Sequence, residues 1–262
     1  MQSYPEIQRN LRTKILTMYK RANAGHIACS LSCIDLMIAS LILEKTEDEQ
    51  FILSKGHAAV ALYVSLNYLG EISDEELLTF YTDGTRLSAH PSANKFKNIP
   101  FALGSLGHGL PIAAGIAKAN KILKNNDFCY VLMSDGETNE GTTWEAMHFA
   151  VKNQLDNLIV MIDKNRVQGF GYLQDVLGDT ANPKVWKEIG FEVHETGGHD
   201  VAQIRNTIQH IKSHQNKKPR VIIANTIKGK GVSYMENTID WHYLPMNDEQ
   251  YQLALKEVNH QK

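Results

Sequence analysis

Four short apolar runs in the second half of the chain constrain its fold most strongly. They are FCYVLM (residues 128–133), NLIVMID (157–163), FEVHET (191–196) and RVIIANT (220–226). Apolar residues recur at helical spacing before and between these runs, in residues 7–19, 31–43, 58–69, 110–123, 143–151 and 201–211. Almost continuously apolar strands that alternate with amphipathic helices are typical of a parallel sheet covered on both faces. We therefore predict an α/β fold, a three-layer sandwich with a mostly parallel central sheet flanked by helices.

Length and composition indicate one ordinary globular domain. The chain has 262 residues, 43% of them hydrophobic and 21% charged, with no internal repeat and no linker rich in Pro, Gly or Ser. We expect residues 1–262 to form a single domain, with residues 245–262 as a terminal extension. The net charge of −2 argues against a nucleic-acid or anionic-membrane partner. The longest apolar runs, in residues 36–43, are too short to span a bilayer.

The cysteines and the N-terminus indicate a cytoplasmic protein. Three cysteines, Cys29, Cys33 and Cys129, are an odd number without CxxC spacing. We expect them to be buried thiols in a reducing cytoplasm. Cys29 and Cys33 lie one helical turn apart and could share a metal, but simple burial is the favoured interpretation. The polar N-terminus lacks the apolar core of a signal peptide.

Polar residues follow two of the predicted strands directly. Ser134, Asp135 and Gly136 come after residues 128–133, and Asn165 comes shortly after residues 157–163. A right-handed crossover would make the two strands parallel, so that both loops open at the same edge of the sheet. Asp135 and Asn165 could then converge.

Such a convergence has two interpretations. A carboxylate, an amide oxygen and a backbone carbonyl form the hard oxygen set that Mg²⁺ prefers, usually completed by water and phosphate. A helix beginning near Thr138 would direct its N–H groups into the same region, which suits a phosphate. The alternative is an Asp-Gly turn and a helix cap, for which these residues are common. The two loops alone leave both interpretations open.

Further motifs resemble the transketolases, a branch of the thiamine diphosphate-dependent enzymes. SDGETNEG followed by NLIVMIDKNRVQ resembles the thiamine diphosphate signature. The other motifs are similar in order to transketolase segments: ANAGHIACSLSCIDLM, FILSKGHAAVALY, SAHP, GSLGHGLPIAAGIA, and NTIKGKGVSYMEN with WH. The matches extend from about residue 22 to residue 242, most of the chain. The resemblance implies the thiamine diphosphate-binding fold.

The resemblance also implies roles for the residues of these motifs. Asp135 and Asn165, with the backbone carbonyl of Val167, are expected to bind Mg²⁺, and Asn165 also to contact the cofactor. Gly136 is expected to let the backbone pass close to the diphosphate. Three further residues, Gly104, Ser105 and Leu106, are expected to offer backbone groups to the aminopyrimidine ring.

Four of the eleven histidines match transketolase positions. The resemblance implies that His57 reaches the diphosphate. It also implies that His26, His90 and His242 are catalytic residues lining the substrate channel, with His242 close to the reactive carbon of the cofactor. An imidazole can donate, accept or transfer a proton near neutral pH, which suits this work. The histidines without a motif are expected to be surface or structural residues: His148, His194, His210, His214 and His260.

Three charged residues have two interpretations each. The resemblance places Glu140 near a subunit interface, and the alternative is an exposed acid in the first turn of a helix. Lys228 and Lys230 lie in a glycine-spaced loop, and we expect a flexible basic loop in preference to a phosphate contact.

The resemblance further implies a partner chain. In transketolases a glutamate that activates the cofactor belongs to a pyrimidine-binding domain, and this chain ends at Lys262 without one. We expect a C-terminal transketolase subunit to supply that domain, in a heterotetramer of two copies of each chain. The GHIA motif, where single-chain transketolases commonly have GHPG, favours the same interpretation. The pair would transfer a two-carbon ketol unit from a ketose (phosphate) to an aldose (phosphate), using thiamine diphosphate and Mg²⁺.

Some positions depart from the usual transketolase pattern, and rival functions follow from them. Ser134 replaces a glycine, His108 replaces a common glutamine, and WHYLPMN replaces WHGKAPN, which makes the role of His242 and the substrate uncertain. The substrate could be an unusual sugar. One rival is a subunit of another thiamine diphosphate enzyme that acts on 2-oxoacids, and another is a non-catalytic cofactor-binding module. The histidine motifs and the Asp135/Asn165 pair argue against both.

Overall fold

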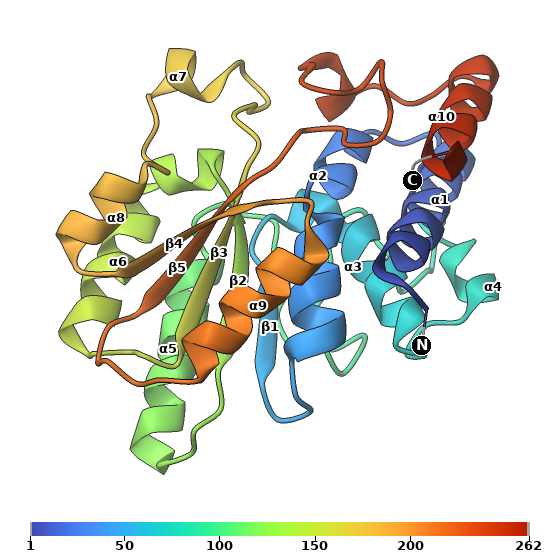
Figure 1. Cartoon of the computed structure of the whole chain (residues 1–262). Coiled ribbons are helices and arrows are strands. Elements are labelled where there is room, and N and C mark those ends of the chain that lie inside the picture. Colours follow the sequence, from blue (N-terminus) through green and yellow to red (C-terminus); the bar gives the residue numbers. More distant parts are fainter. Residues whose placement is uncertain (1, 261–262) are drawn as a thin grey trace.

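Five parallel strands form the centre of the molecule (Figure 1). The structure is a computed structural model, and it describes residues 2–260. The strands are β1 (Gln50–Leu53), β2 (Cys129–Ser134), β3 (Leu158–Lys164), β4 (Glu192–Gly197) and β5 (Arg220–Asn225), in the order β1-β2-β3-β5-β4. Every neighbouring pair is parallel, with Ser134 of β2 opposite Asp163 of β3. The predicted α/β fold with a parallel sheet is confirmed.

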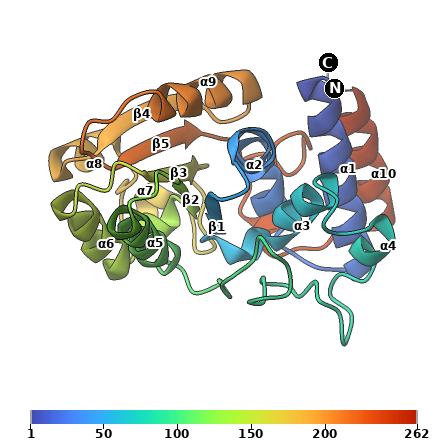
Figure 2. The ribbon, with the colours of Figure 1, turned by 90° about the horizontal axis from the view of Figure 1, so that it is seen from below.

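Helices cover both faces of this sheet (Figures 1 and 2). On one face lie α5 (Gly109–Leu123), α6 (Gly141–Lys152) and α8 (Pro183–Ile189). On the other face lie α2 (Ile27–Met37) and α9 (Val201–Lys212), with α1 (Tyr4–Ala22), α3 (Ala59–Tyr68) and α10 (Asp248–His260) packed farther out. The short helices α4 (Asp74–Leu77) and α7 (Leu173–Val176) lie in loops. These layers form the predicted three-layer sandwich.

The alternation of strand side chains explains the two helical layers. Tyr130 and Leu132 of β2 belong to the core beneath α2 and α9, whereas Val131 and Met133 belong to the core beneath α5 and α6. Successive side chains of a strand point to opposite faces, so a central strand must be apolar throughout. This requirement explains why the strands read as unbroken apolar runs in the sequence.

The helix that begins at Ile27 is longer than the apolar runs indicated. α2 continues without a break into a π-helical segment, Ile38–Glu44. Together they form an 18-residue helix with a mean hydropathy of 1.9, which is long and apolar enough to cross a membrane. However, 83% of this window is buried inside the protein, against the sheet and the neighbouring helices. Such burial is typical of the core helix of a globular domain.

The C-terminal segment packs onto the N-terminal helix. Ala254 and Val258 of α10 are buried, and the Tyr251 and Thr17 hydroxyl groups lie 3.0 Å apart. The extension expected at residues 245–262 therefore contains a helix in contact with α1 over its described part, and residues 261–262 lie outside the described residues.

Candidate active site

A cavity of about 470 Å³ opens at the carboxyl ends of the strands. It lies where β2 and β3 end, at the edge where a parallel sheet commonly binds its ligands. All but one of the residues assigned to the site from sequence line it: His26, His57, His90, Gly104, Leu106, Asp135, Gly136, Asn165, Val167 and His242. The exception is Ser105, which is exposed on the loop between Gly104 and Leu106. The structure therefore brings together motifs that are separated by more than two hundred residues in the sequence.

Asp135 and Asn165 meet because the pairing of β2 with β3 ends just before them. The Asp135 amide donates to the Asp163 carbonyl at 3.3 Å, which continues the ladder by one residue. The Arg166 amide then donates to Asp135 Oδ2 at 2.5 Å, and the Gly136 amide donates to Oδ1 at 2.8 Å. These contacts place the carboxylate beside the loop that begins at Asn165.

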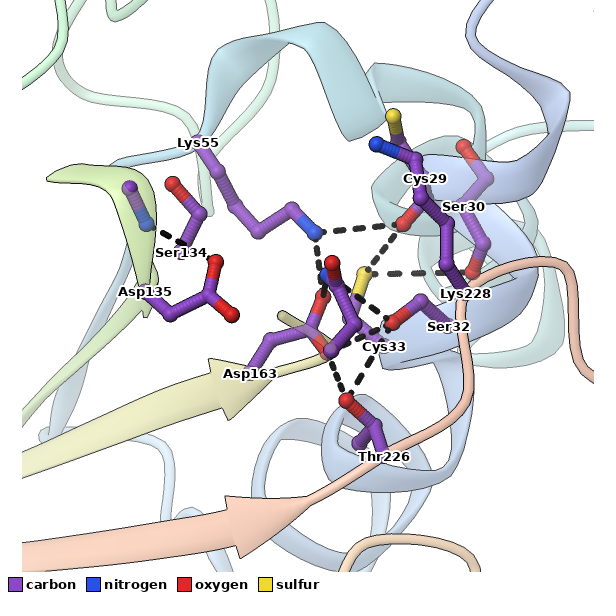
Figure 3. A network of polar contacts seen from close by, with 12 residues as sticks. Cys29, Ser30, Ser32, Cys33, Lys55, Ser134, Asp135, Asp163, Thr226 and Lys228 are labelled. Atoms are coloured by element: carbon purple, nitrogen blue, oxygen red, sulfur yellow. Dashed lines mark hydrogen bonds and ion pairs between the residues drawn. The ribbon is translucent and has the colours of Figure 1, made fainter. Parts of the chain in front are cut away.

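A second buried acid, Asp163, lies at the end of β3 and is fully compensated. Lys55 forms an ion pair with it, and both side chains are almost completely buried. The hydroxyl groups of Ser32 and Thr226 also donate to its carboxylate (Figure 3). Burial opposes ionisation, but Lys55 and these donors together lower the pKa of Asp163.

Asp135 has no such compensation. Its side chain is 1% exposed, and within residues 2–260 no lysine or arginine forms an ion pair with it. In Figure 3 the dashed lines from Lys55 lead to Asp163 and Cys29, and none leads to Asp135. Burial, with a smaller contribution from Asp163, raises the pKa of Asp135 to about 6. A buried carboxylate in need of a positive charge suits a divalent cation.

The neighbouring oxygen atoms complete a set suited to Mg²⁺. Asn165 donates through Nδ2 to Asp163 Oδ2 at 3.2 Å and to Ser32 Oγ at 3.3 Å, and Oδ1 accepts from the Val167 amide at 3.0 Å. The donor bonds fix which way the amide points, and Oδ1 keeps a second lone pair. Asp135, Asn165 and the Val167 carbonyl are all oxygen donors in one cavity, so the chemistry of these residues fits the ion expected from the sequence.

The glycine after Asp135 is needed for space. A Cβ atom on Gly136 would lie 2.9 Å from Cδ and Cγ of Gln168, which also lines the cavity. Gly104 is similarly crowded, with His90 Cδ2 2.9 Å from its hypothetical Cβ. Both positions keep backbone atoms available at the cavity wall, as a cofactor bound through the main chain requires.

Lys228 corrects the prediction of a flexible basic loop. Its side chain is 1% exposed, and Nζ donates to the Val167 carbonyl at 2.9 Å and lies 2.8 Å from His242 Nδ1. Lys228 therefore presents a buried positive charge to the cavity beside an expected metal ligand. Lys230 is different, because it is partly exposed and pairs with Glu236 at 3.4 Å.

Four histidines surround the cavity: His26, His57, His90 and His242. The ring centroid of His26 lies 5.6 Å from that of His57, 6.2 Å from that of His90 and 5.2 Å from that of His242. A backbone hydrogen bond of 3.0 Å from the His26 amide to the His242 carbonyl joins the two ends of the chain here. We call these four residues the cavity histidines.

Burial and nearby cations keep the cavity histidines neutral. Burial lowers the pKa of His26 and of His57 to about 4, and that of His242 to about 3, and it also lowers the pKa of His90. Lys55 adds to the effect at the first three of these histidines, and Lys228 adds to it at His26 and His242. Neutral imidazoles can both donate and accept hydrogen bonds, which suits a site for polyhydroxylated ligands.

Two functional candidates were missed in the sequence. Cys29 was assigned to simple burial, but its thiol lies in the cavity wall, 3.8 Å from His242 Nδ1. Burial raises its pKa, but Lys228 and His57 outweigh that effect and bring it to about 6. Glu137 is completely buried and accepts from the Gly107 amide at 2.8 Å and the Ser134 amide at 3.2 Å, and burial raises its pKa to about 7. Glu137 thus ties the Gly104–Leu106 loop to the end of β2.

The helix after the acidic loop begins later than expected. A 3-10 turn spans Gly136–Asn139, and α6 starts at Gly141 instead of near Thr138. Glu140 is the exposed residue that precedes α6, and it lines the mouth of the cavity. His108 is exposed and contacts the Leu106 carbonyl at 3.2 Å, so it lies on the loop beside the cavity and not in its wall.

Comparison with known proteins gives one consistent family. Residues 9–261 match the model of the transketolase thiamine diphosphate-binding domain. One of the named subunits of apulose-4-phosphate transketolase, from Actinobacillus succinogenes, is 35% identical, over 98% of this chain and 97% of that one. The protein of the same name from Phocaeicola vulgatus is 37% identical, over 95% and 91% of the two chains. The SqwG subunit of 6-deoxy-6-sulfo-D-fructose transketolase from a Clostridium species is 32% identical, over 95% and 93%.

Solved structures agree with the architecture. Transketolase from Campylobacter jejuni superposes with a TM-score of 0.86 at 28% identity, covering 99% of this chain and 43% of that one. Transketolase from Leishmania mexicana, at 22% identity, shares the fold with a TM-score of 0.85 and 45% coverage of its chain. The chain thus spans less than half the length of these solved chains.

Proposed function

This chain belongs to the transketolase family as its thiamine diphosphate-binding domain, and from that premise we propose that it is the cofactor-binding subunit of a two-chain transketolase. The enzyme is a transferase that moves a two-carbon ketol unit from a ketose phosphate to an aldose phosphate. The observation that carries the proposal is the buried, uncompensated Asp135 carboxylate beside Asn165, in one cavity with four neutral histidines. The two apulose-4-phosphate transketolase subunits that resemble it have almost its length.

The cofactor end of the cavity is assigned from these contacts. Asp135, Asn165 and the Val167 carbonyl hold Mg²⁺, and Gly136 and His57 face the diphosphate. The loop Gly104, Ser105 and Leu106 lies beside the aminopyrimidine. Thiamine diphosphate, when bound, supplies the electron sink for breaking and forming the carbon–carbon bond. Lys228 adds a positive charge that suits the diphosphate oxygens.

The substrate end of the cavity belongs to His26, His90 and His242. Because burial keeps His26 and His242 unprotonated at neutral pH, each can accept a proton from a sugar hydroxyl and return it. The short distances between the rings let them bind neighbouring hydroxyl groups of one sugar. Their contribution is therefore orientation of the substrate and transfer of its protons.

The partner is a second chain that carries the pyrimidine-binding domain. An uncovered apolar rim at the cavity mouth supports this proposal: Phe170 is 90% exposed, Leu177 69% and Tyr172 48%. These residues lie on and around α7, which projects from the body of the molecule in Figure 1. Exposed apolar patches of this kind mark interaction surfaces. We propose that the partner covers this apolar rim and Glu140, in a heterotetramer of two copies of each chain.

The substrates are proposed as anionic sugars. The relatives are named for apulose-4-phosphate and 6-deoxy-6-sulfo-D-fructose, which supports a ketose bearing a phosphate or a similar charged group. Tyr243 follows His242 where a glycine is usual and lines the cavity, so it narrows the choice of sugar. We place the enzyme in the cytoplasm, which its three free, buried thiols favour.

Calorimetry with thiamine diphosphate and Mg²⁺ tests the cofactor site. The Asp135→Ala variant is expected to lose Mg²⁺-dependent binding, whereas Asp83→Ala, an exposed aspartate outside the cavity, should retain it. Equal binding by wild type and Asp135→Ala would refute the assignment. The binding should be weak without the partner, because half of the cofactor site is missing.

Ketol transfer tests the reaction itself. The chain mixed with its partner should transfer a two-carbon unit between sugar phosphates, and neither chain should do so alone. Turnover by the isolated chain would overturn the two-chain proposal. Decarboxylation of pyruvate, in place of ketol transfer, would instead support an enzyme of 2-oxoacids.

A further inference from the structure

A second group of histidines lies at the edge of the sheet, on residues that have no specific role in the site described above. Glu192 and His194 belong to β4, the edge strand, and His210 and His214 lie at the end of α9 and just after it. The two β4 residues are two apart and share one face of a strand, and the two histidines are four apart and share one face of a helix. α9 packs on β4, so the two pairs meet. We call His194, His210 and His214 the edge histidines.

Glu192 is held so that one oxygen faces the edge histidines. Its Oε2 accepts from Asn216 Nδ2 and from Arg220 Nε at 3.2 Å. Its Oε1 instead lies 2.8 Å from His194 Nε2 and 3.2 Å from His214 Nε2. The carboxylate is therefore anchored on one side and presented to imidazoles on the other.

The hydrogen bonding of His214 prepares one nitrogen as a ligand. Its Nδ1 lies 2.9 Å from the His210 carbonyl, which can only accept, so Nδ1 carries the proton of the neutral ring. Nε2 then directs a lone pair toward Glu192 Oε1, which is also an acceptor. Metal-binding histidines commonly use this arrangement, because a backbone acceptor at one nitrogen fixes the other as the ligand.

From this arrangement we propose that Glu192, His210 and His214 form a site for a first-row transition metal ion such as Zn²⁺. Their three potential ligand atoms all lie within 4.8 Å of one another. Ligands about 2.0–2.1 Å from a tetrahedral ion lie about 3.3 Å apart, close to the 3.2 Å between Glu192 Oε1 and His214 Nε2. His194 holds the Glu192 carboxylate from the other side and is a positioning residue.

The proposed ion differs in kind from the one assigned to the cavity. Imidazole nitrogens suit Zn²⁺, Ni²⁺ or Cu²⁺, whereas the all-oxygen set at Asp135 suits Mg²⁺. The edge site is open to solvent, since His210 is exposed and the His214 side chain is 35% exposed, so an ion can enter it directly. A bound ion would join the end of α9 to the outermost strand. The site does not depend on the proposed enzymatic function.

Zinc titration of the full chain tests this inference. The protein is stripped with a chelator and titrated with ZnCl₂ in excess Mg²⁺ and thiamine diphosphate. Wild type should bind Zn²⁺, and His210→Gln should weaken that binding by at least about tenfold, since even outer-shell partners of metal ligands contribute 10–100-fold. The matched control His148→Gln, an exposed helical histidine on α6, should bind like wild type.

Two results would overturn the proposal. One is the absence of Zn²⁺ binding by wild type, and the other is equal affinity in wild type and His210→Gln. Zinc that enters the cavity through Cys29 and the cavity histidines is unaffected by a change at His210, so the difference between the two proteins reports on the edge alone. Thermal unfolding without zinc checks folding, and zinc should raise the midpoint of wild type and His148→Gln but not of His210→Gln.

Discussion

The cavity histidines and the edge histidines are the same residue type in two opposite environments. The cavity rings are surrounded by burial and by the cations Lys55 and Lys228, which hold His26, His57 and His242 neutral. The edge rings lie around a carboxylate, that of Glu192, and are more open to water. The first environment favours hydrogen bonding to a neutral ligand, and the second favours a cation. Surroundings, and not residue type, decide what a histidine does.

The two regions also rest on different foundations. The cavity lies on buried charges, with the Lys55–Asp163 pair directly behind Asp135 and Asn165. The edge site lies on side chains that water can reach. The following experiments are chosen to separate the two regions.

The largest effect is expected from Lys55→Met. It leaves Asp163 buried and unpaired, and breaking a buried pair in this way costs about 3–5 kcal/mol. Urea unfolding should show a fall of this size in the free energy of unfolding. Lys97→Met, which breaks an exposed pair with Glu47, should leave the midpoint unchanged. Equal effects of the two substitutions would mean that the floor of the cavity is solvated.

Gly25→Ala tests how rigidly the cavity histidines are joined. A Cβ atom on Gly25 would lie 2.3 Å from the carbonyl oxygen of Tyr243, beside the hydrogen bond between His26 and His242. Relief of that overlap should cost about 1–3 kcal/mol and weaken cofactor binding. The matched change Gly115→Ala, in α5 with open space around it, should stabilise the protein by about 0.5–1 kcal/mol. Thermal and urea unfolding measure both, and an unchanged stability of Gly25→Ala would show that the junction is pliable.

Stability should fall as the pH falls from 6.5 to 5.5. His26, His57 and His242 have lowered pKa values in the folded protein, so the unfolded chain binds more protons and acid favours unfolding. Asp135 and Glu137 have raised pKa values and act in the opposite direction. Three groups against two leave a net uptake of about one proton on unfolding, or about 1.4 kcal/mol per pH unit.

Urea unfolding at several pH values measures this slope. His57→Asn should flatten it by nearly one proton, because one of the three depressed groups is removed. Replacing an edge histidine, as in His210→Gln, should leave it unchanged. A slope that responds equally to both substitutions would erase the contrast between the two groups.

The smallest effect is expected at the edge itself. Without zinc, His210→Gln should change the free energy of unfolding by no more than about 0.5 kcal/mol, as is usual for exposed positions. Urea unfolding in the presence of a chelator measures it. A larger loss would mean that the edge histidines stabilise the fold without a metal.

The strands and the convergence of the motifs could be predicted because their signals are local. The predicted run at residues 157–163 differs by one residue from β3, since a strand buried on both faces must be apolar throughout. β1 was missed because Gln50–Leu53 is only four residues long and carries no alternation.

The charges of the site could not be predicted in the same way. Lys55 and Asp163 are 108 residues apart in sequence, and nothing near either of them indicates a buried pair. Lys228 resembled a solvent-exposed lysine between glycines, and its burial depends on a loop that folds back, with the Asn237 amide donating to the Lys228 carbonyl at 3.0 Å. Such placements arise from tertiary packing, which a residue's neighbours in sequence do not encode.

The bare side chains of Phe170, Tyr172 and Leu177 set a condition on how the protein is made. Apolar groups left in water attract one another between molecules, so chains waiting for a counterpart compete between correct docking and clumping. A cell must therefore synthesise this polypeptide in step with whatever covers those groups. Co-expression with that counterpart should raise the soluble yield, and polar replacements at Phe170 and Leu177 should do so without it.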